Sequence, residues 1–182
     1  MKKNSLANIF SATNPLKILS FLSDNPGKEF LGSEIKKATS MSRAGVYITL
    51  RDLIELNLVH KNQKGKILMY SVVFTNPIIK QFKVLKNIVN LEKAVQKLKN
   101  ISRKIILFGS SSRGEDYSDS DLDVFILAKD TEAAKAILST IKNGRKIQAV
   151  IKTPAEFSGF QETEKVFHSE IERGITLWEE HE

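Results

Sequence analysis

The segment Leu107–Leu127, LFGSSSRGEDYSDSDLDVFIL, carries the most informative pattern in this chain. An apolar run ends in the pair Gly109-Ser110, and after a ten-residue spacer two aspartates, Asp121 and Asp123, open a second apolar run. Side chains alternate across a strand, so the two carboxylates share one face. A Gly-Ser turn that enters a helix leaves backbone N–H groups available to phosphate oxygens. The segment therefore predicts two strands around a site for a nucleoside triphosphate and Mg²⁺.

This pattern resembles the nucleotidyltransferase superfamily of DNA polymerase beta, in which Gly-Ser ends one strand and Asp-x-Asp opens the next. The two strands are expected at 104–108 and 122–127, and the short domain is similar to the minimal members of the superfamily. Arg113 is expected to reach a phosphate or, alternatively, to form a surface salt bridge with Glu115 or Asp116. The resemblance implies that Asp121 and Asp123 are the catalytic metal ligands, and that Gly109, Ser110, Ser111 and Arg113 hold the triphosphate of a nucleotide, expected to be ATP.

A third carboxylate, present on a later strand in active members of the superfamily, is missing from its expected position. That carboxylate completes the metal site and accepts the proton of the attacking hydroxyl. The corresponding strand is predicted at 146–151, where Gln148 stands in place of the acid, and a neutral amide cannot act as a base. Glu156 is a substitute only if the chain folds back; otherwise it is an early carboxylate of a helix begun by Pro154. Turnover is left open, whereas nucleotide binding is compatible with Gln148.

Charge divides the 182-residue chain into two unlike halves. Residues 1–100 carry 17 Lys+Arg and 6 Asp+Glu, a net charge of +11, whereas residues 101–182 carry 11 and 15, a net charge of −4. A strongly basic half is typical of proteins that bind polyanions, although scattered lysines also serve solubility alone. The chain has no cysteine and no long apolar run, so we expect no disulfide, no membrane-spanning segment and a cytoplasmic location.

The N-terminal part predicts three helices followed by a β-hairpin. Helices are expected after a cap at Asn14, over 33–38, and from Ser42 to about residue 56, and the hairpin turns at Gly65. Asn57 is expected to end the third helix in a left-handed conformation. This order resembles a winged helix-turn-helix domain, and residues 42–59, SRAGVYITLRDLIELNLV, resemble its recognition helix.

By this resemblance, the outward face of the third helix would contact double-stranded DNA. The start of a recognition helix usually reaches base edges in the major groove, and the wing contacts phosphates or the minor groove. A solvated basic face, or a winged helix that binds protein, explains the same pattern without DNA. The expected DNA contacts are Ser42, Arg43, Tyr47, Arg51, Lys64 and Lys66.

We therefore expect an α+β protein with a winged helix at 1–75, a linker helix at 76–100, and a minimal nucleotidyltransferase domain with a mixed sheet at 101–182. A homodimer is expected because two-fold DNA sites match two-fold proteins. Three functions remain open. One is a transcriptional regulator that senses or uses a nucleotide. Another is a transferase of nucleoside monophosphate to a protein or RNA hydroxyl, including an antitoxin that adenylylates a HEPN-type toxin partner. The third is an inactive fold kept for dimerisation or sensing.

Overall fold

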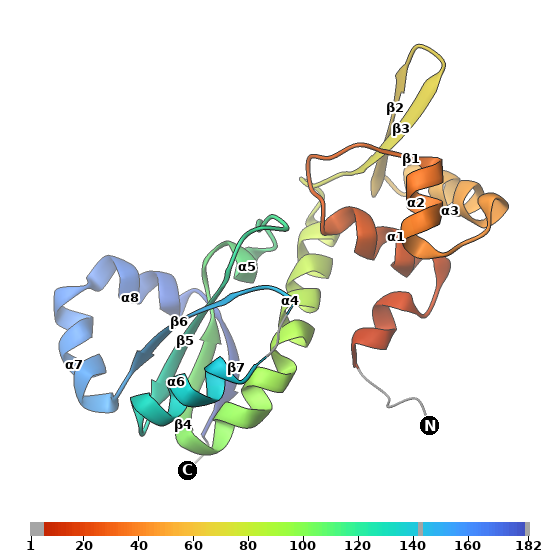
Figure 1. The fold of residues 1–182 in the computed structure, drawn as a ribbon. Coiled ribbons are helices and arrows are strands. Elements are labelled where there is room, and N and C mark those ends of the chain that lie inside the picture. Colours follow the sequence, from red (N-terminus) through yellow and green to blue (C-terminus); the bar gives the residue numbers. More distant parts are fainter. Residues whose placement is uncertain (1–5, 142–143, 181–182) are drawn as a thin grey trace, which may run out of the picture. The chain divides into compact units, whose positions relative to one another are not determined.

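The computed structural model describes residues 6–141 and 144–180, and the chain divides into two compact units, Met1–Lys83 and Val84–Glu182. The division falls inside α4 (Pro77–Leu98), within the segment expected to be a linker helix (Figure 1). Each unit has its own sheet and its own buried core, which confirms the α+β class. Neither α4 nor any other helix in the described part of the chain is long and apolar enough to cross a membrane.

The first unit consists of helices followed by a β-hairpin with one additional strand. Strands β2 and β3 pair antiparallel around Gly65, whose φ of +62° suits a tight turn, and a two-residue strand pairs with the other edge of β3. This short strand, β1, was expected only as an extended link. In chain order the elements are η1 (Leu6–Ser11), α1 (Asn14–Ser23), β1 (Phe30–Leu31), α2 (Gly32–Thr39), α3 (Arg43–Glu55), β2 (Val59–Lys64) and β3 (Ile67–Val72).

Local chemistry sets the ends of α1 and α3. The prediction that Asn14 caps α1 is wrong, because Asn14 is the first helical residue and Thr13 takes the cap position without a side-chain hydrogen bond. Ser42 does cap α3: its hydroxyl accepts the N–H of Gly45 at 3.1 Å. Asn57 follows α3 with a φ of +55°, the left-handed conformation that asparagine tolerates better than most residues.

The second unit is built on a mixed four-stranded sheet in the order β6-β5-β4-β7. Strands β5 and β6 are parallel, and the other neighbours are antiparallel. The strands expected at 104–108 and 122–127 correspond to β4 and β5. After α4 the elements are η2 (Lys99–Ile101), β4 (Ser102–Leu107), α5 (Gly109–Arg113), β5 (Leu122–Ala128), α6 (Thr131–Ser139), β6 (Ile147–Lys152), α7 (Pro154–Thr163), α8 (Lys165–Glu172) and β7 (Ile175–Glu179).

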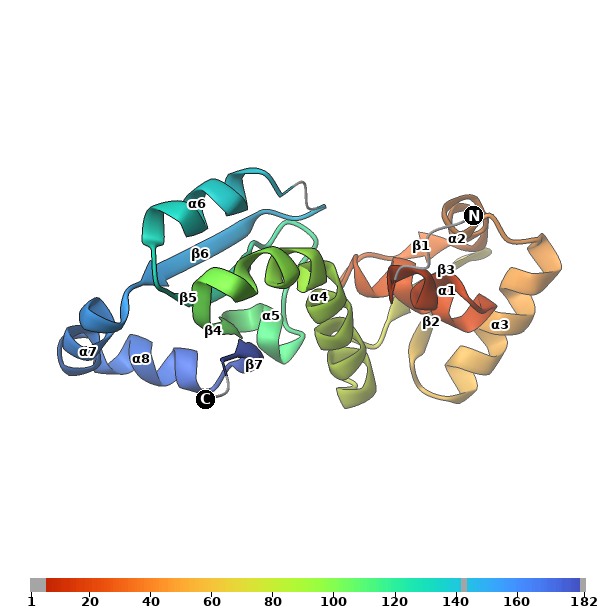
Figure 2. The same ribbon diagram turned by 90° about the horizontal axis from the view of Figure 1, so that it is seen from below.

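Alternation along β5 assigns its side chains to two different cores. Val124 and Ile126 pack in the core shared with α4 and α6, whereas Phe125 packs with Phe157 of α7 in a second core. Figure 2 shows α4 and α6 on one side of the sheet and α7 and α8 on the other. Asp123 precedes Phe125 by two residues, so it lies on the face that carries α7 and α8, at the start of the strand.

Candidate functional site

The turn at Gly109 lies directly against the strand that carries Asp123. Gly109 has a φ of +69°, and a Cβ added to it would lie 2.6 Å from Oδ2 of Asp123. The preceding residue, Phe108, donates its N–H to the carbonyl of Asp123 at 3.0 Å. Any side chain at position 109 would strike the carboxylate, and the left-handed backbone disfavours other residues independently. Glycine thus allows the main chain of the turn to approach the carboxylate.

Local hydrogen bonds hold the serines that follow Gly109. The hydroxyl of Ser111 is fully buried and donates to the carbonyl of Phe108 at 3.1 Å, and Ser112 donates to the carbonyl of Gly109 at 2.8 Å. The Ser111 hydroxyl therefore stabilises the turn and is not placed for the phosphate contact that the sequence predicts. Ser110 is partly exposed and, with the main chain of the turn, remains available to a phosphate.

Asp121 and Asp123 form an electrostatically coupled pair at the start of β5. Burial, and then the negative charge of Asp121, raise the pKa of Asp123, while the guanidinium of Arg145 opposes this increase. Asp121 has a cationic neighbour, since Nζ of Lys146 lies 3.1 Å from its Oδ2. Such coupling requires the two carboxylates to lie near each other, as a shared cation would also require.

The chemistry of this pair fits a Mg²⁺ ion that arrives with a nucleotide. Mg²⁺ prefers oxygen ligands and is commonly bound through one or two carboxylates plus substrate phosphates. A cation between Asp121 and Asp123 would relieve the repulsion that contributes to the raised pKa of Asp123. In the part of the chain that the structure describes, no group of three or more His, Cys, Asp and Glu residues could hold a metal alone. Phosphate oxygens would therefore have to complete the coordination.

Gln148 lies beside Asp123, where the sequence analysis places the missing acid. The register of the parallel pair sets Asp123 opposite Gln148 and Phe125 opposite Val150. Val150 packs in the same core as Phe125, so Gln148 shares the face of the sheet that carries Asp123. An exposed amide, and not a third carboxylate, thus flanks the aspartate pair.

Glu156 is a helix cap and does not replace the missing acid. Its Oε2 accepts the backbone N–H of Thr153 at 2.7 Å and the Thr153 hydroxyl at 2.9 Å, and these bonds lower the pKa of Glu156. Thr153 follows the end of β6, whereas Asp123 lies at the start of the parallel strand β5. The length of a strand therefore separates Glu156 from the aspartate pair, and the interpretation in which the chain folds back is wrong.

Arg113, the last residue of α5, makes ion pairs with two carboxylates. Its NH1 lies 2.6 Å from Oε1 of Glu170 on α8, and its Nε lies 3.2 Å from Oε2 of Glu115. These two bonds, that to Glu170 first, raise the pKa of Arg113. The salt-bridge alternative holds for Glu115. A phosphate contact from Arg113 would have to compete with both carboxylates.

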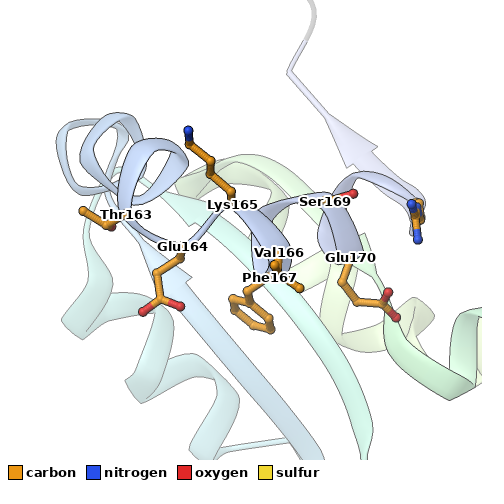
Figure 3. A pocket seen from close by; sticks show the side chains of 8 residues that line it. Thr163, Glu164, Lys165, Val166, Phe167, Ser169 and Glu170 are labelled. Carbon is orange, nitrogen blue, oxygen red and sulfur yellow. The ribbon is translucent and has the colours of Figure 1, made fainter.

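Glu170 also lines an open cavity of about 930 Å³ along α8. Figure 3 shows Glu164, Phe167 and Glu170 projecting from the same side of the helix. The described lining comes from 163–173 alone and includes neither aspartate of the pair. This cavity therefore borders the candidate site through the Arg113–Glu170 ion pair and is not the site itself.

A largely buried network, which no sequence motif indicates, joins α4 to both halves of the site. Asp116 is only 1 % exposed and accepts hydrogen bonds from Asn87 at 3.1 Å and from Arg145 at 2.6 Å. The same Asn87 donates to the carbonyl of Ser111 at 2.9 Å, and Arg145 donates to the carbonyl of Ser120. These residues are far apart in sequence, and a lone Asp, Asn or Arg gives no pattern that would have identified them.

In the first unit, part of the expected DNA-binding set lines one hollow. The guanidinium of Arg43 stands 5.9 Å from the centre of the Tyr47 ring. Both residues, together with Lys36 and Lys66, line a hollow of about 480 Å³ between the start of α2, the start of α3 and β3. Arg43, Tyr47 and Lys66 are exposed, so they are brought together on the surface.

The other three residues of that set have partners within the protein. Nζ of Lys64 lies 2.5 Å from Oε2 of Glu29, and Arg51 pairs with its exposed neighbour Asp52 at 3.3 Å. The Ser42 hydroxyl is engaged in capping α3. A direct DNA contact from any of these side chains would have to replace an existing interaction.

Comparison with known families agrees with the geometry of the second unit. The family described as "Polymerase beta, Nucleotidyltransferase" matches residues 89–182, just over half of the chain. The match lies within Val84–Glu182 and includes the Gly109 turn, the aspartate pair and Gln148. No curated protein matches the chain.

Proposed function

We propose that this chain, which belongs to the polymerase beta nucleotidyltransferase family, is a DNA-binding regulator. Its C-terminal domain is proposed to bind a nucleoside triphosphate with Mg²⁺. The observation that carries the nucleotide site is the approach of the Gly109 turn to Asp123, with 2.6 Å between an added Cβ and Oδ2. This approach brings the main-chain donors of a phosphate turn against a carboxylate that suits a metal.

In the proposed complex, Asp121 and Asp123 hold Mg²⁺, and the turn from Gly109 to Ser110 binds phosphate oxygens. The ion would neutralise phosphate charge and polarise the phosphorus–oxygen bonds. Lys146, which lies 3.1 Å from Asp121, would turn from that carboxylate toward the phosphates. ATP is the nucleotide to test first.

Gln148 argues for binding without efficient transfer. A general base must accept a proton from the attacking hydroxyl, and an amide beside Asp123 has no capacity to do so. The two-metal arrangement also loses a negatively charged ligand at this position. The proposed role of the domain is therefore to sense a nucleotide, and transfer of a nucleoside monophosphate is the competing function.

For the first unit, we propose a winged helix domain that binds double-stranded DNA. Its support is the order of three helices and a hairpin, the net charge of +11 over residues 1–100, and the exposed cluster of Arg43, Tyr47 and Lys66. Arg43 and Tyr47 lie in the first turns of α3, the part of a recognition helix that usually reaches base edges. Lys66 lies at the tip of the hairpin, where a cation would meet a phosphate.

Calorimetric titration of the full chain with ATP tests the nucleotide site. We expect binding that requires MgCl₂ and is lost in the Asp121→Asn variant, because one metal ligand becomes neutral. Asp119→Asn is the matched control, since Asp119 is an exposed aspartate of the same loop. Binding that is independent of Mg²⁺, or equally weakened by both substitutions, would contradict the proposal.

Labelled ATP distinguishes sensing from transfer. We expect the wild-type chain to label neither itself nor a HEPN-type toxin partner or RNA, whereas Gln148→Asp should acquire slow transfer by restoring an acid beside Asp123. Efficient transfer by the wild-type chain, lost in Asp121→Asn, would establish the antitoxin-type or another transferase function in place of sensing.

A further inference from the structure

A part-buried arginine, Arg145, links the residues directly before β5 to the rest of the second unit. All three nitrogens of the Arg145 guanidinium donate hydrogen bonds, and its side chain is only 16 % exposed. Nε and NH2 donate to the carbonyl of Ser120 at 3.0 and 2.8 Å, and NH2 also reaches the carbonyl of Asp121 at 3.3 Å. One end of the guanidinium therefore holds the main chain immediately before, and at, the first aspartate of the pair.

The other end of Arg145 is held by two buried partners. NH1 donates to Oδ2 of Asp116 at 2.6 Å and to Oδ1 of Asn87 at 3.0 Å. Asp116 belongs to the loop between α5 and β5, and Asn87 lies on α4 and is 3 % exposed. The fork of the guanidinium thus bridges a side-chain pair and a stretch of main chain, a geometry that a lysine cannot reproduce.

Asn87 extends the network to the phosphate turn. Its amide group donates to the carbonyl of Ser111 at 2.9 Å as well as to Oδ1 of Asp116 at 3.1 Å. The same three side chains therefore contact the main chain of α5 and the main chain at Asp121. These are the two segments that the proposed nucleotide site must hold at a fixed separation.

Stability alone is a weak explanation for such a network. Taking an ion pair out of water costs much of the free energy that the attraction between its charges returns. Well-packed apolar residues at the same place often stabilise a fold to an equal degree. The hydrogen bonds of Arg145 also fix the position of a loop. They hold main-chain carbonyls in the segment between Arg113 and Leu122, which has little regular structure. Polar partners behind metal ligands commonly have this role.

From this geometry, and resting on the proposed function, we infer that Arg145, Asp116 and Asn87 are positioning residues that hold the aspartate pair at a fixed distance from the phosphate turn. None of the three needs to touch the nucleotide. Their effect is exerted through the carbonyls of Ser111, Ser120 and Asp121.

The test compares the wild-type full chain with Arg145→Lys, which keeps the charge but loses the fork. Titration with ATP and MgCl₂ should show affinity reduced by about tenfold or more, the range typical of lost partners behind metal ligands. Hydrogen exchange without nucleotide should become faster at the amides of 116–122 and remain unchanged in α6. Asp116→Asn should reproduce both effects.

Two control variants separate positioning from general destabilisation. Leu98→Ala removes a buried side chain at the far end of α4 and lowers stability without touching the network. Arg103→Lys makes the same chemical change at an exposed site on β4. The inference is supported if Arg145→Lys loses affinity and Leu98→Ala, at equal or greater loss of stability, does not.

Two other outcomes would contradict the inference or the proposed function on which it rests. If Arg145→Lys binds ATP like the wild type, or loses no more affinity than Leu98→Ala, the inference is overturned while the proposed function stands. If the wild-type chain itself binds no ATP with MgCl₂, the proposed function fails, and the inference that rests on it fails with it.

Discussion

At the scale of single residues, Gly109 is a position where both the backbone conformation and the available space require glycine. We predict that Gly109→Ala lowers the free energy of unfolding by about 1–2 kcal/mol through its left-handed backbone alone. The new Cβ, 2.6 Å from the Asp123 carboxylate, must add to this loss and displace one side of the nucleotide site. Urea unfolding and titration with ATP and MgCl₂ measure the two effects.

Gly65→Ala is the matched control for this prediction. Gly65 has a similar φ of +62°, but nothing lies within 4 Å of a Cβ added there. The Gly65→Ala variant therefore measures the stability lost through a left-handed backbone conformation without a steric clash. A Gly109→Ala protein that is no less stable than Gly65→Ala and still binds ATP would mean that the turn and Asp123 are not tightly packed.

The raised pKa of Asp123 makes stability depend on pH. Between the ordinary aspartate pKa and the raised value, the folded protein keeps a proton that the unfolded chain has released, so stability falls as pH rises through this range. We predict that Asp123→Asn is more stable than the wild type at neutral pH, because it removes a part-buried charge that desolvation, and then the charge of Asp121, disfavour. The difference should disappear in acid well below the ordinary aspartate pKa of about 3.9, where both folded and unfolded wild-type chains are protonated.

Thermal unfolding across pH, with and without MgCl₂, checks this prediction. With ATP present throughout, Mg²⁺ should stabilise the wild type increasingly as pH rises, since only ionised carboxylates bind it, and should stabilise Asp123→Asn much less. A less stable Asp123→Asn protein at neutral pH would show that the carboxylate is compensated in the folded state.

At the level of single elements, the N-terminus of α3 depends on its cap. Ser42→Ala should cost about 1 kcal/mol of stability, because the N–H of Gly45 loses its acceptor. Thr13→Ala is the matched control at the start of α1, where the cap side chain makes no such bond, and should have little effect. Chemical unfolding measures both variants, and equal losses would refute the assigned role of Ser42.

Elements with strong local signals could be predicted from the sequence. The hairpin around Gly65, the end of α3 at Asn57 and the strands on either side of the Gly109 turn follow from residue preferences that act within a few positions. The two-residue strand β1 could not, because it is defined only by pairing of Phe30 and Leu31 with β3. Its partners lie some forty residues further along the chain.

The sequence motif of the candidate site could be predicted, whereas the residues that hold this motif in position could not. Gly109 and Asp123 belong to one spaced pattern, whereas Arg145 meets Asp116 and Asn87 across separations of 29 and 58 residues. A salt bridge also alters the expected role of Arg113, and it depends on Glu170, which no local rule connects to α5. Such contacts come from the topology of the sheet and cannot be read from single residue types.

For the whole molecule, the charge asymmetry predicts salt-sensitive binding to duplex DNA. The affinity of the full chain should fall linearly with salt on logarithmic axes, and Lys66→Ala should reduce the slope by about one, because one phosphate contact is lost. Lys93→Ala, which changes an exposed lysine of the second unit, is the control. Gel shifts at several salt concentrations measure the slopes. Absence of binding at low salt would leave the first unit without a DNA-binding role.

Helix α4 has a practical consequence for anyone who wishes to produce the two units as separate fragments. It supplies Ile79 to the core of the first unit and Leu91, Ala94 and Leu98 to the core of the second. Truncation at either end of this helix would therefore leave one fragment with an open core, and a cut in the middle would leave two short helical stubs of marginal stability. Fragments that overlap across 77–98, each carrying the entire helix, are the pieces most suited to independent expression.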